Sequence, residues 1–235
     1  MRWEFTPDEF LYAWGQLGAD RNPVPLSLRP SVAWRDEWEK IERALRQRLP
    51  VLEDPDLLPV LRTAADPDMS LLLIGKRKHP MRAYGAATAN VGVTLAQRPG
   101  PEPAVGGNVV IEVGSPGLVP KVFAAVSGNQ PAGRHASMVE SWDRLQDTHS
   151  VVGLVRDESS IADRMRQLLI APRAGYGHIE IRWDHRTKRP QQRYLSWFDV
   201  EGDGRYTYTR RYGDFHIDPC SADEFRRSLA RLMQA

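Results

Sequence analysis

The strand-forming segments of this chain are joined by short turns, and this limits the folds that it can adopt. Two such turns are the basic segment Lys76–Pro80 and the segment Glu201–Gly204, which holds two glycines and an aspartate. Turns of this length join antiparallel strands, whereas parallel strands need long crossover connections. The sequence therefore predicts an antiparallel sheet and argues against a doubly wound parallel one. The expected strands are 70–74, 82–90, 91–97, 108–113, 178–183, 193–200 and 205–211.

Two capping boxes mark the first and the last predicted helix. Thr6 precedes Glu9, and Ser221 precedes Glu224, with the same spacing of three residues. At this spacing the hydroxyl and the carboxylate each accept a hydrogen bond from a free backbone N–H of the other residue. Further helices are expected at 55–65, 118–126 and about 161–169.

The segment Ser31–Leu49 has the clearest amphipathic pattern in the chain. Trp34, Trp38, Ile41 and Leu45 recur at helical spacing, with charged residues between them. We therefore predict a helix over this segment and assign Trp34 and Trp38 to the hydrophobic core.

The order of elements in the first part of the chain recurs in the second. Asn108–Val126 and Phe215–Met233 each combine a short strand, a turn marked by proline and an amphipathic helix. We expect a single α+β domain over 1–235, with halves at about 1–128 and 151–235 that share one antiparallel sheet. A linker with one short helix is expected at about 129–150.

Charge and cysteine content exclude several classes of function. The chain has 32 basic and 30 acidic residues, whereas nucleic-acid-binding domains carry an overall or clustered excess of positive charge. Cys220 is the single cysteine, so a disulfide or a cysteine zinc site within the chain is excluded. A helix N-terminus can lower the pKa of such a thiol, but most thiols in this position are inert. No motif for a cofactor is recognised, and none is expected.

The first residues, MRWEFTPDEF, lack the apolar run of a signal peptide. The longest apolar stretch, Leu71–Ile74, is also far shorter than the roughly 20 residues of a membrane span. A cytoplasmic location without membrane contact is therefore expected.

Two histidine–carboxylate pairs resemble fragments of a metal or hydrolase site. His178 and Glu180 lie on one face of a predicted strand near His185, and His216 and Asp218 repeat the spacing. A third ligand at a recognised spacing is missing in both cases, so we interpret these residues as solvent-facing positions and expect no metal site and no catalytic residues.

The segment Lys76–Lys78 is the strongest basic cluster. It lacks the glycine spacing and the Ser or Thr of a phosphate-binding loop, and edge-protecting charge at a hairpin tip is the simpler interpretation. A module that binds an anionic ligand or nucleic acid through this turn, together with Arg210 and Arg211, is kept as the alternative function.

Aromatic residues are concentrated around the predicted C-terminal hairpin. One face of the sheet there is expected to be covered by helices, so aromatic side chains on the other face either pack in the core or contact a partner. The residues concerned are Trp183, Trp197, Phe198, Tyr206, Tyr208 and Tyr212.

Three segments together resemble the EspG family of type VII secretion-associated proteins. They are the opening helix Thr6–Phe10, the extension Asn22–Leu28 with its Pro-x-Pro-Leu, and Asp199–Tyr206 followed by a strand and a capped C-terminal helix. The resemblance extends over essentially the whole chain, and none of the three is a catalytic signature.

The resemblance implies a cytosolic chaperone without enzymatic activity. Members of the family bind PE–PPE heterodimers, cover the hydrophobic tip of the PPE helical bundle and supply the dimer to its secretion system. The implied fold is a central antiparallel sheet flanked by helical bundles, with a pseudo-twofold relation between the halves. The sheet surface and the C-terminal bundle would bind the partner, which places in the binding region Met165, Leu168, Leu169, Leu195, Trp197, Tyr206 and Tyr208.

Overall fold

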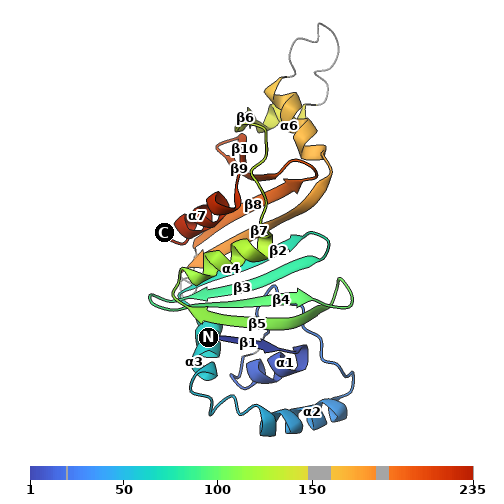
Figure 1. Cartoon of the computed structure of the whole chain (residues 1–235), viewed down its shortest axis with the longest axis vertical. Coiled ribbons are helices and arrows are strands. Elements are labelled where there is room, and N and C mark those ends of the chain that lie inside the picture. Colours follow the sequence, from blue (N-terminus) through green and yellow to red (C-terminus); the bar gives the residue numbers. More distant parts are fainter. Residues whose placement is uncertain (20, 148–159, 184–190, 235) are drawn as a thin grey trace.

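The computed structural model describes residues 1–19, 21–147, 160–183 and 191–234. These residues form one ten-stranded sheet with the order β1-β5-β4-β3-β2-β7-β8-β9-β10-β6 (Figure 1). Every neighbouring pair is antiparallel, so the predicted antiparallel α+β class is confirmed. The strands are β1 (Arg2–Phe5), β2 (Met69–Lys76), β3 (Pro80–Ala87), β4 (Gly92–Pro99), β5 (Gly106–Gly114), β6 (Met138–Ser141), β7 (Arg173–Trp183), β8 (Gln191–Val200), β9 (Arg205–Arg211) and β10 (Asp214–Pro219).

Helices pack on both faces of this sheet, and two of them begin with the predicted capping boxes. The hydroxyls of Thr6 and Ser221 accept hydrogen bonds from the backbone N–H of Glu9 and Glu224, whose carboxylates accept in return. The helices in the described residues are α1 (Pro7–Gly15), α2 (Arg35–Arg48), α3 (Leu57–Ala65), α4 (Leu118–Ser127), α5 (Trp142–Gln146), α6 (Ile161–Ile170) and α7 (Ala222–Leu232).

The first face of the sheet is covered in its middle by α4 and α7, which pack against each other (Figure 1). Phe123 of α4 and Phe225 of α7 are fully buried there with Trp197 of β8. The cluster draws residues from β2, β3, β7 and β8, so it links the two halves of the sheet. Because successive side chains of a strand point to opposite faces, the residues that alternate with this cluster lie on the other face of the sheet.

The opposite face is covered only toward its two ends. Near β4 and β5, α1 and α3 pack on it around Phe10 and Leu61. At the other end, α5 and α6 pack on it around Leu145 and Met165. Between these two groups the face of β2 and β7 carries exposed side chains, including Ile74 and Tyr176. We call this region the open face.

A buried ion network joins the halves beside the first face. The carboxylate of Asp199 accepts hydrogen bonds from Nε and Nη2 of Arg205, at 2.7 and 3.1 Å, and from Nη2 of Arg77, at 2.8 Å. Arg205 also donates to the carbonyl of Ser127 at the end of α4. Asp199 and Arg205 are fully buried, so this network is part of the interior of the domain.

The structure corrects the assignment of Trp34 to the core. The helix α2 begins at Arg35, and Trp34 precedes it with 74% of its surface exposed. Trp38 is half-buried, and Leu45 is the buried residue of the helix. The periodicity did identify a helix, but α2 lies at one end of the molecule and packs mainly on α1, so its first turns face solvent (Figure 1).

The segment predicted as a linker contributes to the sheet. Residues 138–141 form β6, which pairs with β10 at one edge, and 142–146 form the short helix α5. The two flanking helical bundles and the pseudo-twofold relation between the halves remain predictions.

Candidate functional site

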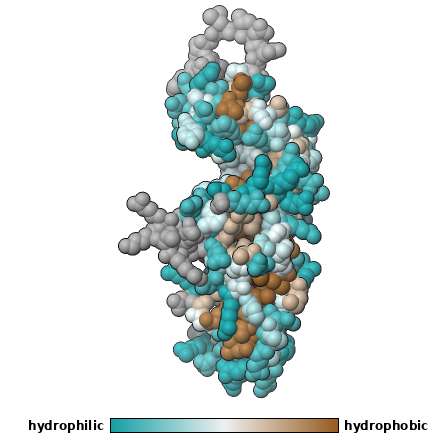
Figure 2. Space-filling view, turned by 90° about the vertical axis from the view of Figure 1, so that its left-hand side faces the viewer, coloured by the Kyte–Doolittle hydropathy of each residue, from teal (hydrophilic) through white to brown (hydrophobic). Residues whose placement is uncertain are grey.

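A groove of about 640 Å³ lies on the open face, beside α5 and α6. It follows the register of the sheet, because Ile74 lies opposite His178, and Tyr176 lies between Lys76 and Phe198. A hollow in the outline of the molecule is visible in Figure 2 below the end that carries α6. The residues that line this open-face groove are Ile74, Lys76, Trp142, Leu169, Arg173, Tyr176, His178, Trp197, Phe198, Tyr208 and Phe215. Trp197 directs its ring to the first face, where it packs on Phe225.

Stacked aromatic rings form the wall of the groove at β8, β9 and β10. Trp142 contacts Phe215 at a centroid distance of 5.5 Å, and Phe215 contacts Tyr208 at 5.7 Å. Tyr208 in turn contacts Phe198 at 5.9 Å. Phe198 and Phe215 are buried in this cluster, and Tyr208 and Trp142 are partly accessible. The accessible rings form an apolar surface of the kind that binds apolar side chains of a partner.

Arg173, the first residue of β7, supplies a polar group in the groove. Its guanidinium lies 3.8 Å from the centroid of the Phe198 ring, and its Nη2 donates to the carbonyl of Leu169 at 2.5 Å. Burial lowers the pKa of this guanidinium. Its Nη1 is buried and has no hydrogen-bond partner among the described residues, so one donor of a fixed cation remains unused.

The structure places two of the seven predicted partner-binding residues at the groove surface. Leu169 is half-buried and Tyr208 is 36% exposed, and both line the groove. The other five are buried in the core of the domain, where a partner would contact them only after local rearrangement. These residues are Met165, Leu168, Leu195, Trp197 and Tyr206.

Sequence reasoning missed the exposed residues of β2 and β7. Ile74 is 43% and Tyr176 is 50% exposed, and both line the groove. The alternation of side chains along each strand places Ile74 and Tyr176 on the same face of the paired strands β2 and β7, and this was the signal that could have identified them. It could not be used without the order of the strands, because β2 and β7 are distant in sequence.

The histidine–carboxylate pairs are separated by other contacts. His178 lines the groove, but Glu180 accepts hydrogen bonds from Nε and Nη2 of Arg182 at 2.7 and 2.8 Å. These bonds hold the pKa of Glu180 below its usual value. His185 lies outside the described residues. Within the described ranges, no three His, Cys, Asp or Glu residues are arranged to hold a metal ion. The second pair, His216 and Asp218, lies on β10.

The basic turn Lys76–Lys78 is divided between the interior and the surface. Arg77 turns inward to Asp199 and is part of the buried ion network. Lys78 is exposed at the tip of the β2–β3 hairpin, and Lys76 borders the open-face groove. The three cations therefore do not form one continuous basic surface.

Cys220 is buried before α7, and burial raises the pKa of its thiol to about 11, with a smaller contribution from Glu224. A raised pKa keeps the thiol protonated at neutral pH, which contradicts activation by the helix. We expect labelling by iodoacetamide at about pH 8 to be about a hundredfold slower in the native protein than in denaturant. Mass spectrometry of the labelled protein would measure both rates, and similar rates would show that the thiol is accessible.

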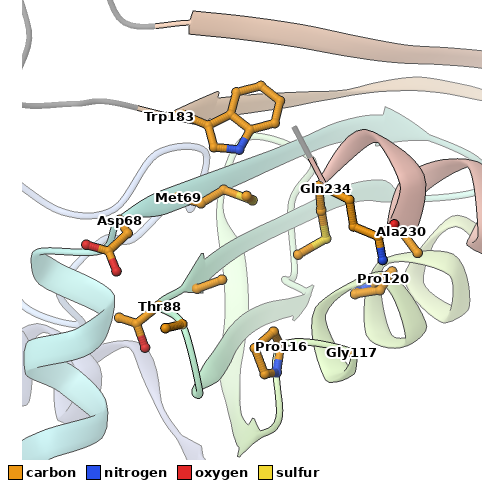
Figure 3. A pocket seen from close by; sticks show the side chains of 12 residues that line it. Asp68, Met69, Thr88, Pro116, Gly117, Pro120, Trp183, Ala230 and Gln234 are labelled. Atoms are coloured by element: carbon orange, nitrogen blue, oxygen red, sulfur yellow. The ribbon is translucent and has the colours of Figure 1, made fainter.

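A second pocket, of about 410 Å³, lies where α4 and α7 meet the ends of β2 and β3 (Figure 3). Trp183, Met69 and Pro120 project toward it from three different elements. It has an apolar lining and is separated from the open-face groove by the sheet.

Comparison with known proteins identifies the family. A model described as the EspG family matches residues 6–231. The chain belongs to the EspG family. The match begins directly after β1 and includes the other nine strands and both capped helices, apart from the last residue of α7. A search of curated proteins gives no match. Family membership is consistent with a type VII secretion-associated chaperone.

None of the described helices combines the length and apolar character required to cross a membrane.

Proposed function

We propose that this EspG-family protein is a cytosolic chaperone that binds the apolar tip of a PE–PPE-like helical heterodimer in the open-face groove. The proposed role keeps the substrate soluble and presents it for secretion, and it needs neither catalysis nor a cofactor. The single observation that supports it most strongly is a preformed aromatic groove, left uncovered between two groups of helices, in a chain of this family.

The dimensions and lining of the groove fit this role. A helical tip is held by apolar side chains inserted between aromatic rings, and the groove offers such rings from α5, β8, β9 and β10. Exposed apolar side chains extend the surface beyond the groove, with Ile170 of α6 at 83% exposure and Tyr194 of β8 at 57%. Exposed large apolar side chains are common at protein–protein contact sites when they lie together.

The seven residues predicted for partner binding then have two roles. Leu169 and Tyr208 would contact the substrate directly. The other five are core residues and would act only by maintaining the fold around the groove.

Co-expression with PE–PPE-like substrates encoded in the same genome tests the proposal. We expect a stable complex of one chaperone and one heterodimer by gel filtration with light scattering. The double variant Ile74→Ser, Tyr176→Ser should weaken this complex at least tenfold, because two exposed apolar side chains are removed from the contact. Calorimetric titration would measure the affinity.

The matched control is Trp34→Ser, which removes a larger exposed apolar side chain at the far end of the molecule. It should leave the affinity within twofold. If no cognate substrate co-purifies or is kept in solution, the proposed function is wrong. If the groove variants bind as tightly as the parent protein, the substrate binds elsewhere.

A further inference from the structure

The open-face groove has a one-sided charge. Lys76, Arg173 and His178 line it, and within the described part of the chain it has no carboxylate lining. The nearest acid along β7 on this face is Glu180, and both of its oxygens are engaged by Arg182. Negative charge in a bound partner would therefore meet no repelling carboxylate in the groove.

Arg173 carries a positive charge with an unused donor beside the groove. Its guanidinium is held against the Phe198 ring, and one nitrogen is fixed by the carbonyl of Leu169. The remaining nitrogen, Nη1, is buried without a partner among the described residues. Buried donors are almost always paired, so an unpaired one beside a groove indicates a missing acceptor.

We propose that the groove binds a substrate segment with a carboxylate side chain between apolar side chains, and that the Arg173 side chain shifts on binding so that its Nη1, buried in the free protein, donates to that carboxylate. The guanidinium plane suits a carboxylate oxygen, and the charge on both groups strengthens the hydrogen bond. The accessible rings of Tyr176, Tyr208 and Trp142 take the apolar flanks of the segment. That the segment belongs to a secretion substrate rests on the proposed function.

Two small probes of the same shape test the chemistry without a substrate. They are 3-phenylpropanoate, which has a carboxylate, and 3-phenylpropanamide, which has a neutral amide in its place. Titration of the whole protein, followed by the NMR signal of the Trp142 indole N–H, gives both affinities. We expect the carboxylate to bind about tenfold tighter than the amide. Equal affinities would overturn the proposal without any variant being made.

Two variants assign the preference to one side chain. Arg173→Met keeps an apolar side chain against Phe198 but removes the donor. In this variant the carboxylate and the amide should bind with about equal affinity. Arg211→Met removes the same charge from the opposite face of β9 and should leave the preference unchanged. Equal losses in both variants would show a general charge effect and reject the role of Arg173. Thermal unfolding of each variant checks that it is folded.

The complex with a substrate separates this inference from the proposed function. If the complex forms, and the Arg173→Met variant dissociates from the substrate at least tenfold faster than the parent protein, the proposed function and the carboxylate contact are both supported. If the complex forms and is insensitive to Arg173→Met, the carboxylate contact is rejected while the chaperone function stands. If no substrate binds but the probe preference is present, the groove chemistry stands and the proposed function fails.

Discussion

Replacement of Asp199 by alanine is expected to lower the free energy of unfolding by about 3–5 kcal/mol. The carboxylate is fully buried and is the shared acceptor of Arg77 and Arg205. Its removal leaves the fully buried guanidinium of Arg205 without a counter-charge, and Nη1 of that residue already has no hydrogen-bond partner among the described residues. Because a domain is stable by only about 5–15 kcal/mol, this loss is a large part of the total.

Urea unfolding followed by tryptophan fluorescence would measure the effect. The matched control is Asp223→Ala, since Asp223 is an exposed carboxylate that forms a surface pair with Arg226. Its loss should change stability by less than about 1 kcal/mol. A triple variant, Arg77→Met, Asp199→Leu and Arg205→Met, removes all three charges together and should recover most of the stability. A change below about 1 kcal/mol in Asp199→Ala would show that the network contributes little.

Replacement of Trp197 by alanine should destabilise the domain by about 3–5 kcal/mol through the cavity that it creates. The indole is fully buried and meets Phe225 edge to face at a centroid distance of 5.1 Å. It also covers Gly177, where an added Cβ would lie 2.5 Å from the ring. The side chain therefore fills a space formed by two strands and α7.

Trp197 is also one of the seven residues predicted to bind the partner, so this variant has two informative outcomes. Loss of stability in urea, with Trp34→Ala unchanged within about 0.5 kcal/mol, would identify Trp197 as a core residue. A variant that unfolds like the parent protein but no longer binds a substrate would identify it as a contact residue instead. We expect the first result.

Local signals predicted the elements of this fold better than its contacts. Both capping boxes, the β8–β9 hairpin and the antiparallel class follow from residues close together in the chain, where the physical cause is itself local. The strands β1 and β6 were not predicted, because each has four residues and is stabilised by pairing with a distant partner. Exposure of Trp34 was also not predictable, since periodicity shows that a helix has an apolar face but not whether anything covers it.

The candidate site shows the same limit more sharply. Aromatic residues of β8 and β9 lie beside the groove, and Leu169 and Tyr208 line it, but their role in partner binding stays a prediction. Which aromatic side chain is exposed depends on helices that come from other parts of the chain. Arg173 gave no sequence signal at all, because its unused donor is apparent only when its hydrogen bonds in the fold are known.

The pairing of β2 with β7 has a consequence for the order of folding during synthesis. The partners along this seam are separated by 100 positions at Lys76–Tyr176 and by 114 at Met69–Trp183. At a synthesis rate of about 5–20 residues per second, β2 waits roughly 5–20 s for its neighbour, with the apolar residues of its strand open to solvent. A protein with this topology is vulnerable to aggregation before its chain is complete, and long-range pairing of this kind also slows folding.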